Sequence, residues 1–342
     1  IGAMSAIDEV GLKIPQDISV IGIDGTYLGS LPRISLTTIA EPAFEIGEKA
    51  VETLTQNIRV NEMKKEFKLW NTVTGWAVFA VSLIVYLMTI EPTVSFWDCG
   101  EFILCSYRLE VGHPPGAPFF LLLGRFFSLF AGGDTSKVAM MVNILSAFAS
   151  AFTILFLFWT ITHLARKIII NGESEFSNSR IIAVMSAGVV GALAFTFSDS
   201  FWFSAVEGEV YATSSFFTAA VFWAILKWEE VADEEGADRW IILIAYLMGL
   251  SIGVHLLNLL ALPAIVLVYY FKKFEFSWKG LTWSLIGSFG ILALILWGLL
   301  PGLVKISSKF DLFFVNSLRL PPNSGMLFHM ILLAALFIFS IW

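Results

Sequence analysis

Charged residues are scarce in this sequence. Only 14% of the 342 residues are Asp, Glu, Lys or Arg, against about 25% in an ordinary soluble domain. The 21 basic residues form no block, and the net charge of −7 argues against nucleic acid or another polyanion as partner. Hydrophobic residues make up 57% of the chain, and the mean hydropathy is +0.79. These values are typical of a protein that crosses a membrane several times.

Cysteine is equally scarce, with Cys99 and Cys105 alone in the sequence. Two cysteines exclude a disulfide framework and a cysteine-based metal site. Because positions six residues apart on a helix point in different directions, we expect two separate packing thiols. No other spacing typical of metal ligands is evident, so we expect neither a metal nor a resident cofactor.

The composition changes near residue 62, and the chain before that point reads as a small α/β segment. The runs DISVIGID and ISLTTIA are apolar and rich in β-branched residues, which predicts two strands. From Glu41 onward, apolar residues recur on one face, which predicts a helix. The expected domains are therefore residues 1–62 and a separate membrane part, residues 63–342.

Residues 6–58 resemble the end of the sugar-binding effector domain of LacI/GalR-type repressors. The shared order is GLKIPQDISVIG, then LTTI, then a helix. The resemblance implies that Asp24 lies near an effector pocket. The match lacks a DNA-binding headpiece and most of the effector domain, and a unit of about 60 residues buries only about 60% of its surface. We therefore expect a fused, partial periplasmic-binding-like domain. A remnant of a sugar-responsive transcription regulator is kept as one alternative function.

Long apolar stretches dominate the sequence after Met63. Eight are long enough, or nearly so, to cross a bilayer, namely residues 71–90, 138–164, 181–198, 211–228, 240–256, 257–271, 281–300 and 326–342. Because 240–271 is too long for one straight span, we expect a tight hairpin near His255–Asn258. The short stretch 117–131 contains Arg125 and is interpreted as an interfacial helix. The predicted fold class is a mainly α, polytopic transmembrane bundle with a small N-terminal α/β segment.

The distribution of basic residues predicts the orientation of these spans. Lys and Arg collect on the cytoplasmic side of membrane proteins. If the chain after Met63 starts inside, eleven basic residues of this part are cytoplasmic and six are outside. Treating 117–131 as a further span would reverse the later loops and lose that bias. We therefore expect a multi-pass membrane protein whose loop before residue 117 faces the periplasm or a topologically equivalent lumen, and the expected location is the bacterial inner membrane.

The first outward loop, SFWDCGEFILCSYRLEVGHPPGAP, concentrates polar residues beside a span. Asp98 and Glu101 are three residues apart and share one helical face. Carboxyl groups near a membrane boundary are usually functional, and they suit base catalysis or the binding of a polar ligand. The prolines after His113 end the helix and hold that side chain in a rigid turn. Helix capping, or pairing with Arg108, is the structural alternative for the carboxylates.

Two further outward loops contain candidate residues. Glu207 and Glu209 stand among aromatic residues in SDSFWFSAVEGEVYA, either as a site or as a solvated loop. Lys305 and Arg319 lie just outside a span, where they contact a substrate or lipid headgroups. His255 is either a ligand-binding group or a packed polar residue.

Residues 63–342 resemble the N-terminal part of the protein O-mannosyltransferase-like family, long known as a domain of unknown function. The resemblance rests on TIEPTVSFWDCGEFILCSYRLEVGHPPGAP, SFWFSAVEGEVYATSSFF and GLSIGVHLLNLLALP. It implies a membrane glycosyltransferase of the GT-C class, truncated here. Such enzymes take a sugar from a polyprenyl-phosphate donor at the outer membrane face. The resemblance also implies that the acidic catalytic motif corresponds to Asp98 and Glu101.

The expected reaction moves a hexose, such as mannose, to a Ser or Thr hydroxyl of an exported protein. It needs a base for the hydroxyl and cationic or hydrogen-bonding groups for the leaving phosphate. The catalytic candidates are Asp98, as base, and Glu101. The candidates for the donor phosphate are Arg108, His113, Lys305 and Arg319, and those for acceptor or sugar are Glu207, Glu209, Tyr211 and His255. The expected partners are membrane lipid, the lipid-linked sugar and the exported acceptor.

A transporter or flippase for a lipid-linked or polar solute is the rival function, because membrane carboxylates also couple proton movement. Transporters tend to place ionisable residues within spans that are related by internal repeats. In this sequence the polar residues lie in outward loops and no repeat is apparent, which favours the enzyme.

Overall fold

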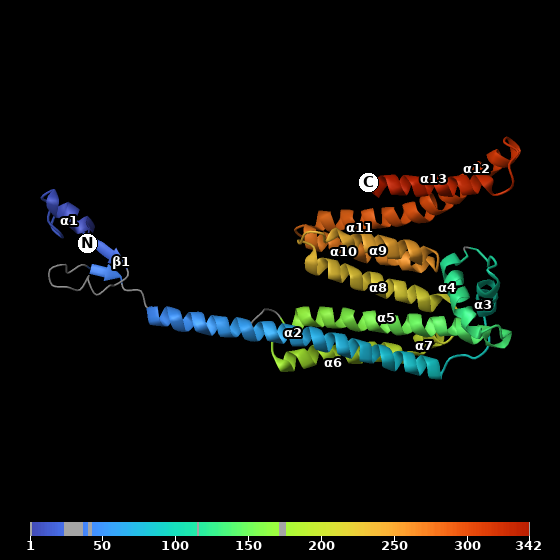
Figure 1. The fold of residues 1–342 in the computed structure, drawn as a ribbon, viewed down its shortest axis with the longest axis horizontal. Helices are drawn as coiled ribbons and strands as arrows, with labels where there is room; N and C mark the ends of the chain where they lie inside the picture. The colour runs from blue at the N-terminus through green and yellow to red at the C-terminus, as the bar shows by residue number, and fades with distance from the viewer. Residues whose placement is uncertain (1, 24–36, 40–42, 115, 171–175, 342) are drawn as a thin grey trace. The chain divides into compact units, whose positions relative to one another are not determined.

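The computed structural model describes residues 2–23, 37–39, 43–114, 116–170 and 176–341 (Figure 1). It divides into two compact units, Ile1–Phe67 with Gly172–Ser177, and Lys68–Asn171 with Asn178–Trp342. Asp24, which the repressor resemblance places near an effector pocket, lies outside the described residues.

The first unit is the small α/β segment. It contains α1 (Gly2–Glu9), β1 (Ile21–Ile23), β2 (Thr37–Ile39) and the beginning of α2 (Ala43–Met88). The strands pair in parallel, with Ile21 opposite Thr37, inside the two runs that predict strands. The predicted apolar face of α2 is exposed at Val51, Leu54 and Ile58. This face therefore gives the segment no core of its own.

The second unit is a bundle of helices. After α2 come α3 (Cys99–Arg108), α4 (Pro118–Ser128), α5 (Val138–Ile169), α6 (Asn178–Thr196), α7 (Asp199–Ala205), α8 (Val210–Val231), α9 (Asp238–Ile252), α10 (Leu262–Lys273), α11 (Trp278–Ala293), α12 (Leu300–Asn316) and α13 (Ser324–Ile341). α5 packs along α6 and α8 and also contacts α3, α4 and α7. In Figure 1, α3, α4 and α7 gather at one end of the bundle.

Six helical segments in the described part of the chain are long and apolar enough to cross a membrane. They are Glu45–Met88, Thr135–Ile169, Asn178–Thr196, Val210–Val231, Leu256–Lys273 and Trp278–Asn316. Each contains one predicted span or nearly all of it. The predicted span 240–256 corresponds to the 15-residue α9, and the described part of the span 326–342 falls in α13. The fold class is the predicted one, a mainly α membrane bundle.

The predicted hairpin follows α8. Helix α9 ends at Ile252, and a six-residue 3-10 helix, η5 (Leu256–Ala261), leads into α10. At the end of α10, Lys273 donates from Nζ to the carbonyl oxygen of Ala232 (2.6 Å) and to Asp233 (3.0 Å), just before α9 begins. Because α10 ends where α9 starts, the chain doubles back, and the hairpin is confirmed.

Helix α4 lies in the stretch interpreted as interfacial, and it joins two parts of the bundle. Arg125 donates through Nη1 to the carbonyl oxygen of Tyr107 (2.7 Å), at the end of α3. The N–H of Phe119 donates to the carbonyl oxygen of Gly253 (2.7 Å), in the turn after α9. A Cβ at Gly253 would lie 2.8 Å from the Phe119 Cβ, so this close approach requires glycine.

Ion pairs join the C-terminal ends of α5 and α8. Buried His163 lies with Nδ1 3.3 Å from the Glu230 carboxylate. Arg166 also donates to Glu230, and Lys167 donates to Glu229 (2.6 Å). These contacts hold the two helices together at the end where both of them finish.

Candidate active site

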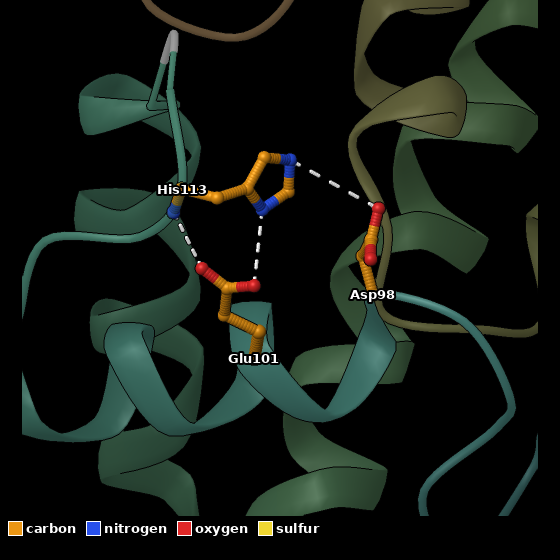
Figure 2. Close-up of side chains that lie close together, drawn as sticks. All are labelled: Asp98, Glu101 and His113. Carbon is orange, nitrogen blue, oxygen red and sulfur yellow. Dashed lines mark hydrogen bonds and ion pairs between the residues drawn. The ribbon is translucent and has the colours of Figure 1, made fainter.

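The segment from Asp98 to His113 folds back on itself through Glu101 (Figure 2). Asp98 is the N-cap residue of α3, and Glu101 lies in the first turn, so both carboxylates emerge at the start of this helix. Glu101 accepts the backbone N–H of His113 through Oε1, and its Oε2 lies 3.0 Å from the His113 Nδ1. The imidazole ring lies between the two carboxylates, with Nε2 4.0 Å from Asp98 Oδ2.

The backbone between α3 and His113 makes this contact possible. Leu109 ends α3 in the left-handed conformation (φ 55°, ψ 47°), which reverses the direction of the chain. A Cβ at Gly112 would lie 3.0 Å from Glu101 Oε1, so a larger residue would press on the carboxylate that receives the His113 N–H. Glycine at this position therefore lets the loop close over Glu101.

The contact with Glu101 favours the protonated form of His113. Its hydrogen bond to Glu101 raises the pKa of the His113 imidazole, and the nearby charges of Glu101 and Asp98 add to the rise. Correspondingly, the hydrogen bonds from His113 lower the pKa of the Glu101 carboxyl. Both side chains are solvent-accessible, so the bulk solvent screens part of the attraction. The pair favours an imidazolium cation held over a carboxylate.

A cavity of about 310 Å³ opens beside this cluster. It is lined by Asp98, Phe102, His113, Gly116, Ala117, Glu209, Val210, Tyr211, Ile252, Val254, His255 and Leu256. The polar residues come from the start of α3, the loop after α3, the start of α8 and the turn after α9. Residues from three separate parts of the chain therefore meet at one end of the bundle.

Glu207 and Glu209 are buried carboxyls, which excludes the solvated-loop interpretation for them. Their exposed fractions are 3% and 5%. The pKa of each carboxyl is raised, and burial is the largest cause. The charge of Glu209 raises the pKa of Glu207 further, and the charge of Asp98 raises the pKa of Glu209 further. The thiol of buried Cys99 lies among them, and burial together with both carboxyls raises its pKa. Glu209 lines the cavity, whereas Glu207 is not among the lining residues.

His255 differs from His113 in its environment. It caps the N-terminus of η5, and its Nδ1 accepts the backbone N–H of Leu257 (3.2 Å). Burial lowers the pKa of its imidazole. A neutral ring with Nδ1 as acceptor carries its proton on Nε2, so His255 has one N–H to donate. The Tyr211 ring lies with its centroid 5.6 Å from that of His255.

Three residues assigned to the donor phosphate do not line this cavity in the described part of the chain. Arg108 is 64% exposed and pairs with Glu110 (3.2 Å). Lys305 lies on α12, and Arg319 follows that helix with a left-handed backbone (φ 58°). Of the four predicted phosphate-binding residues, His113 alone lines the cavity, and the roles of the other three stay predictions.

Asp98, Glu101 and His113 are also the residues best placed for a metal ion among those described. Each offers a donor atom, and these atoms lie within 4.8 Å of one another. Carboxylate and imidazole suit Zn²⁺ and other divalent transition metals. Both oxygens of Glu101 already accept hydrogen bonds from His113, and His113 could bind a metal ion through Nε2 only as the neutral imidazole, which leaves Asp98 as the one carboxylate of these three residues available to such an ion.

Comparisons with known proteins agree with both sequence resemblances. Residues 98–278 match the family model of the protein O-mannosyl-transferase TMEM260 N-terminal domain, and residues 1–74 match a periplasmic binding protein-like domain. Asp98 is the first residue of the longer match. No solved structure was found to match the chain.

The curated relatives divide in the same way. Protein O-mannosyl-transferase tmem260 of Dictyostelium discoideum is 27% identical over 217 residues, which is 61% of this chain and 24% of that protein. The Mus musculus protein O-mannosyl-transferase TMEM260 is 29% identical over 177 residues, covering 52% of this chain and 22% of its own length. The ribose operon repressor of Haemophilus influenzae is 46% identical over 59 residues, which is 17% of this chain and 18% of the repressor. The chain thus spans about a quarter of the length of these two transferases.

Proposed function

Because the chain belongs to the protein O-mannosyl-transferase TMEM260 N-terminal domain family, we propose that it provides the catalytic loop of a membrane glycosyltransferase. The enzyme transfers a hexose, mannose in the simplest case, from a polyprenyl-phosphate donor to a Ser or Thr hydroxyl of an exported protein. The observation that carries the proposal is the cavity where Asp98, His113, Glu209 and His255 meet. The reaction takes place at the outer face of the bacterial inner membrane.

Asp98 is the proposed base of this reaction. It lines the cavity, and although it is the N-cap residue of α3, its carboxylate accepts no hydrogen bond from the backbone N–H groups of the first turn. As the acceptor oxygen forms a bond to the anomeric carbon, its proton passes to Asp98. The bond between that carbon and the phosphate oxygen breaks, and its electron pair leaves with the phosphate. A single displacement of this kind inverts the anomeric centre.

His113 is the proposed cation for the departing phosphate. Charge develops on the phosphate oxygens as the bond breaks, and a fixed cation there stabilises the transition state. Glu101 supports this role by holding the backbone and the ring of His113. His255, with one N–H to donate, and Tyr211 line the same cavity and suit the hydroxyl groups of a sugar.

The placement of the polar groups favours an enzyme over a transporter. Asp98, His113, Glu209 and His255 lie at helix ends and in the loops between helices. Transporters place such groups near the middle of the membrane, at the interface of structural repeats. The direct test is to incubate the purified protein with polyprenyl-phosphate mannose and a Ser/Thr-containing peptide. Sugar-modified peptide supports the enzyme, whereas the absence of transfer with lipid movement in vesicles supports the transporter.

The pH dependence of transfer tests the pairing of His113 with Glu101. Because Glu101 raises the pKa of His113, the imidazolium persists to higher pH, and activity is lost as pH rises through that pKa. Glu101→Gln removes the charge, so we expect the alkaline limb of the kcat/KM profile to move to lower pH. Glu110→Gln, which alters an exposed carboxylate of the same loop, is expected to leave the limb in place. An unchanged limb in Glu101→Gln would contradict the proposed role of His113.

The proposed orientation is tested by reporter fusions. Alkaline phosphatase fused after Gly116, in the loop at the cavity, is expected to be active because that enzyme matures in the periplasm. The same reporter fused after Gly236, between α8 and α9, is expected to be inactive. Reporter levels measured by immunoblot serve as the control. The opposite activities would place the cavity on the cytoplasmic side.

A further inference from the structure

A buried amide joins the two loops that carry the carboxyls of the cavity. Asn143 lies on α5, the central helix of the bundle, and is fully buried. Its Nδ2 donates to the carbonyl oxygen of Glu91 (2.7 Å) and to that of Thr93 (3.0 Å). One side chain therefore binds two backbone carbonyl groups of the segment that connects α2 to Asp98.

The same side chain lies against the loop between α7 and α8. A Cβ at Gly208 would be only 2.8 Å from Asn143 Oδ1, so the amide and this loop are in close contact. The backbone N–H of Glu91 donates to the carbonyl oxygen of Val206 (3.2 Å), which joins the two loops directly. Asn143 thus contacts both loops where they meet.

Packing alone does not account for an asparagine at this position. Burying an amide costs free energy unless it is hydrogen-bonded, and an apolar side chain would fill the space without that cost. Among the described residues Asn143 Oδ1 has no hydrogen-bond partner. Both N–H groups of the Asn143 amide donate hydrogen bonds, whereas its oxygen accepts none from the described residues. The role of this side chain is therefore to bind the two carbonyl groups.

The backbone beside Asp98 adds to the need for support. Trp97 has a left-handed backbone (φ 63°). Its side chain is 87% exposed, so packing of the ring does not hold this conformation. Such a conformation is costly for an aromatic residue, and it persists where the surrounding structure imposes it. The hydrogen bonds of Asn143 fix the chain just before this turn, and the turn delivers Asp98 to the start of α3.

We infer that Asn143 is a positioning residue for the proposed sugar transfer. By holding the segment before Asp98 and the loop before Glu209 on one rigid helix, it keeps both carboxyls on the same cavity. The effect of Asn143 on catalysis rests on the proposed function. Its effect on the two loops rests only on the contacts of its side chain. A misplacement of about 1 Å in a catalytic group can cost roughly 100-fold in rate.

The test compares two variants with a matched control. Asn143→Ala removes the side chain, whereas Asn143→Asp keeps its shape and replaces the donors by a carboxyl. Ser150→Ala, further along the same helix, removes a buried hydroxyl that has no hydrogen-bond partner among the described residues. Hydrogen exchange of the peptides containing Glu91 and Gly208 reports on the loops, and transfer from polyprenyl-phosphate mannose reports on catalysis.

We expect faster exchange of both peptides in Asn143→Ala and Asn143→Asp, and unchanged exchange in Ser150→Ala. We also expect kcat to fall roughly 10- to 100-fold in both Asn143 variants. A protonated carboxyl can donate one hydrogen bond and an ionised carboxyl none. The activity of Asn143→Asp relative to the wild type should therefore be higher at pH 6 than at pH 9, while that of Asn143→Ala should not change with pH.

Each result has a distinct meaning. Wild-type exchange rates in both Asn143 variants would overturn the positioning role. Faster exchange with full transfer activity would restrict Asn143 to the fold and overturn its role in catalysis. If the wild-type protein transfers no sugar, the proposed function fails, and the exchange experiment still decides whether Asn143 holds the loops.

Discussion

Asp98→Asn is expected to lower the rate of sugar transfer by about 1,000-fold, a typical contribution of a positioned general base. The substitution keeps the shape of the side chain but removes its ability to take the acceptor proton. Asp98 is half-exposed and is not buried in the core, so the variant should fold and insert as the wild type does. The rate is measured with polyprenyl-phosphate mannose and a Ser/Thr peptide, and folding by detergent-resistant size and melting temperature.

Two controls make this result specific. Glu110→Gln removes a carboxylate from the same loop, but one that pairs with Arg108, so its activity should remain within about twofold of the wild type. Glu209→Gln tests the other carboxyl of the cavity, whose pKa is raised by burial and by Asp98. Full activity of Asp98→Asn together with loss of activity in Glu209→Gln would transfer the role of base to Glu209.

His113→Gln is expected to lower transfer by about 100-fold, because the departing phosphate loses its cation. Glutamine keeps a hydrogen-bond donor but carries no charge. Arg108→Gln is the matched control, since it also removes one positive charge from this loop. Arg108 points to Glu110 and lies outside the set of residues that line the cavity, so its removal should cost little.

The two variants distinguish a local effect from a general one. If the loop attracts the anionic donor only through its overall charge, both substitutions should weaken binding of the donor equally and should do so less at high salt. If His113 acts at the phosphate, the loss appears in kcat and persists at high salt. Equal losses in the two variants would contradict the specific role of His113.

The candidate site was predictable where it depends on local sequence. The spacing of Asp98 and Glu101 places both at the start of one helix, and the prolines after His113 predict the turn that returns it to them. The structure confirms the start of the helix and the return of His113 to Glu101. The prediction that the prolines end the helix is wrong, because α3 already ends at Arg108, where Leu109 takes a left-handed conformation. Local rules could not predict that Arg108 would pair with Glu110, because this depends on how α3 ends at Leu109.

The sequence did not predict which residues from distant parts of the chain meet in the cavity. Glu209 and His255 were candidates on chemical grounds, but their meeting with Asp98 depends on the packing of α8 and the hairpin after it. Asn143 gave no signal beyond being polar within an apolar stretch. Hydropathy predicted the spans well, since burial in a bilayer requires a long apolar run. Helix α9 ends at Ile252, but the predicted span runs to residue 256 because apolar residues continue through the turn after the helix.

The ion pairs at the far end of α8 help to keep the shape of the cavity. Glu229 and Glu230 bind α5 at one end of this helix, while Tyr211 reaches the cavity from the other end, about 27 Å away. Between the two ends, Thr218 donates to Asn258 (2.8 Å) and Phe217 packs against Phe119, so α8 cannot tilt about its fixed end without breaking contacts in the core. Charges that never meet the substrate therefore help to hold Tyr211 in place in the wall of the cavity.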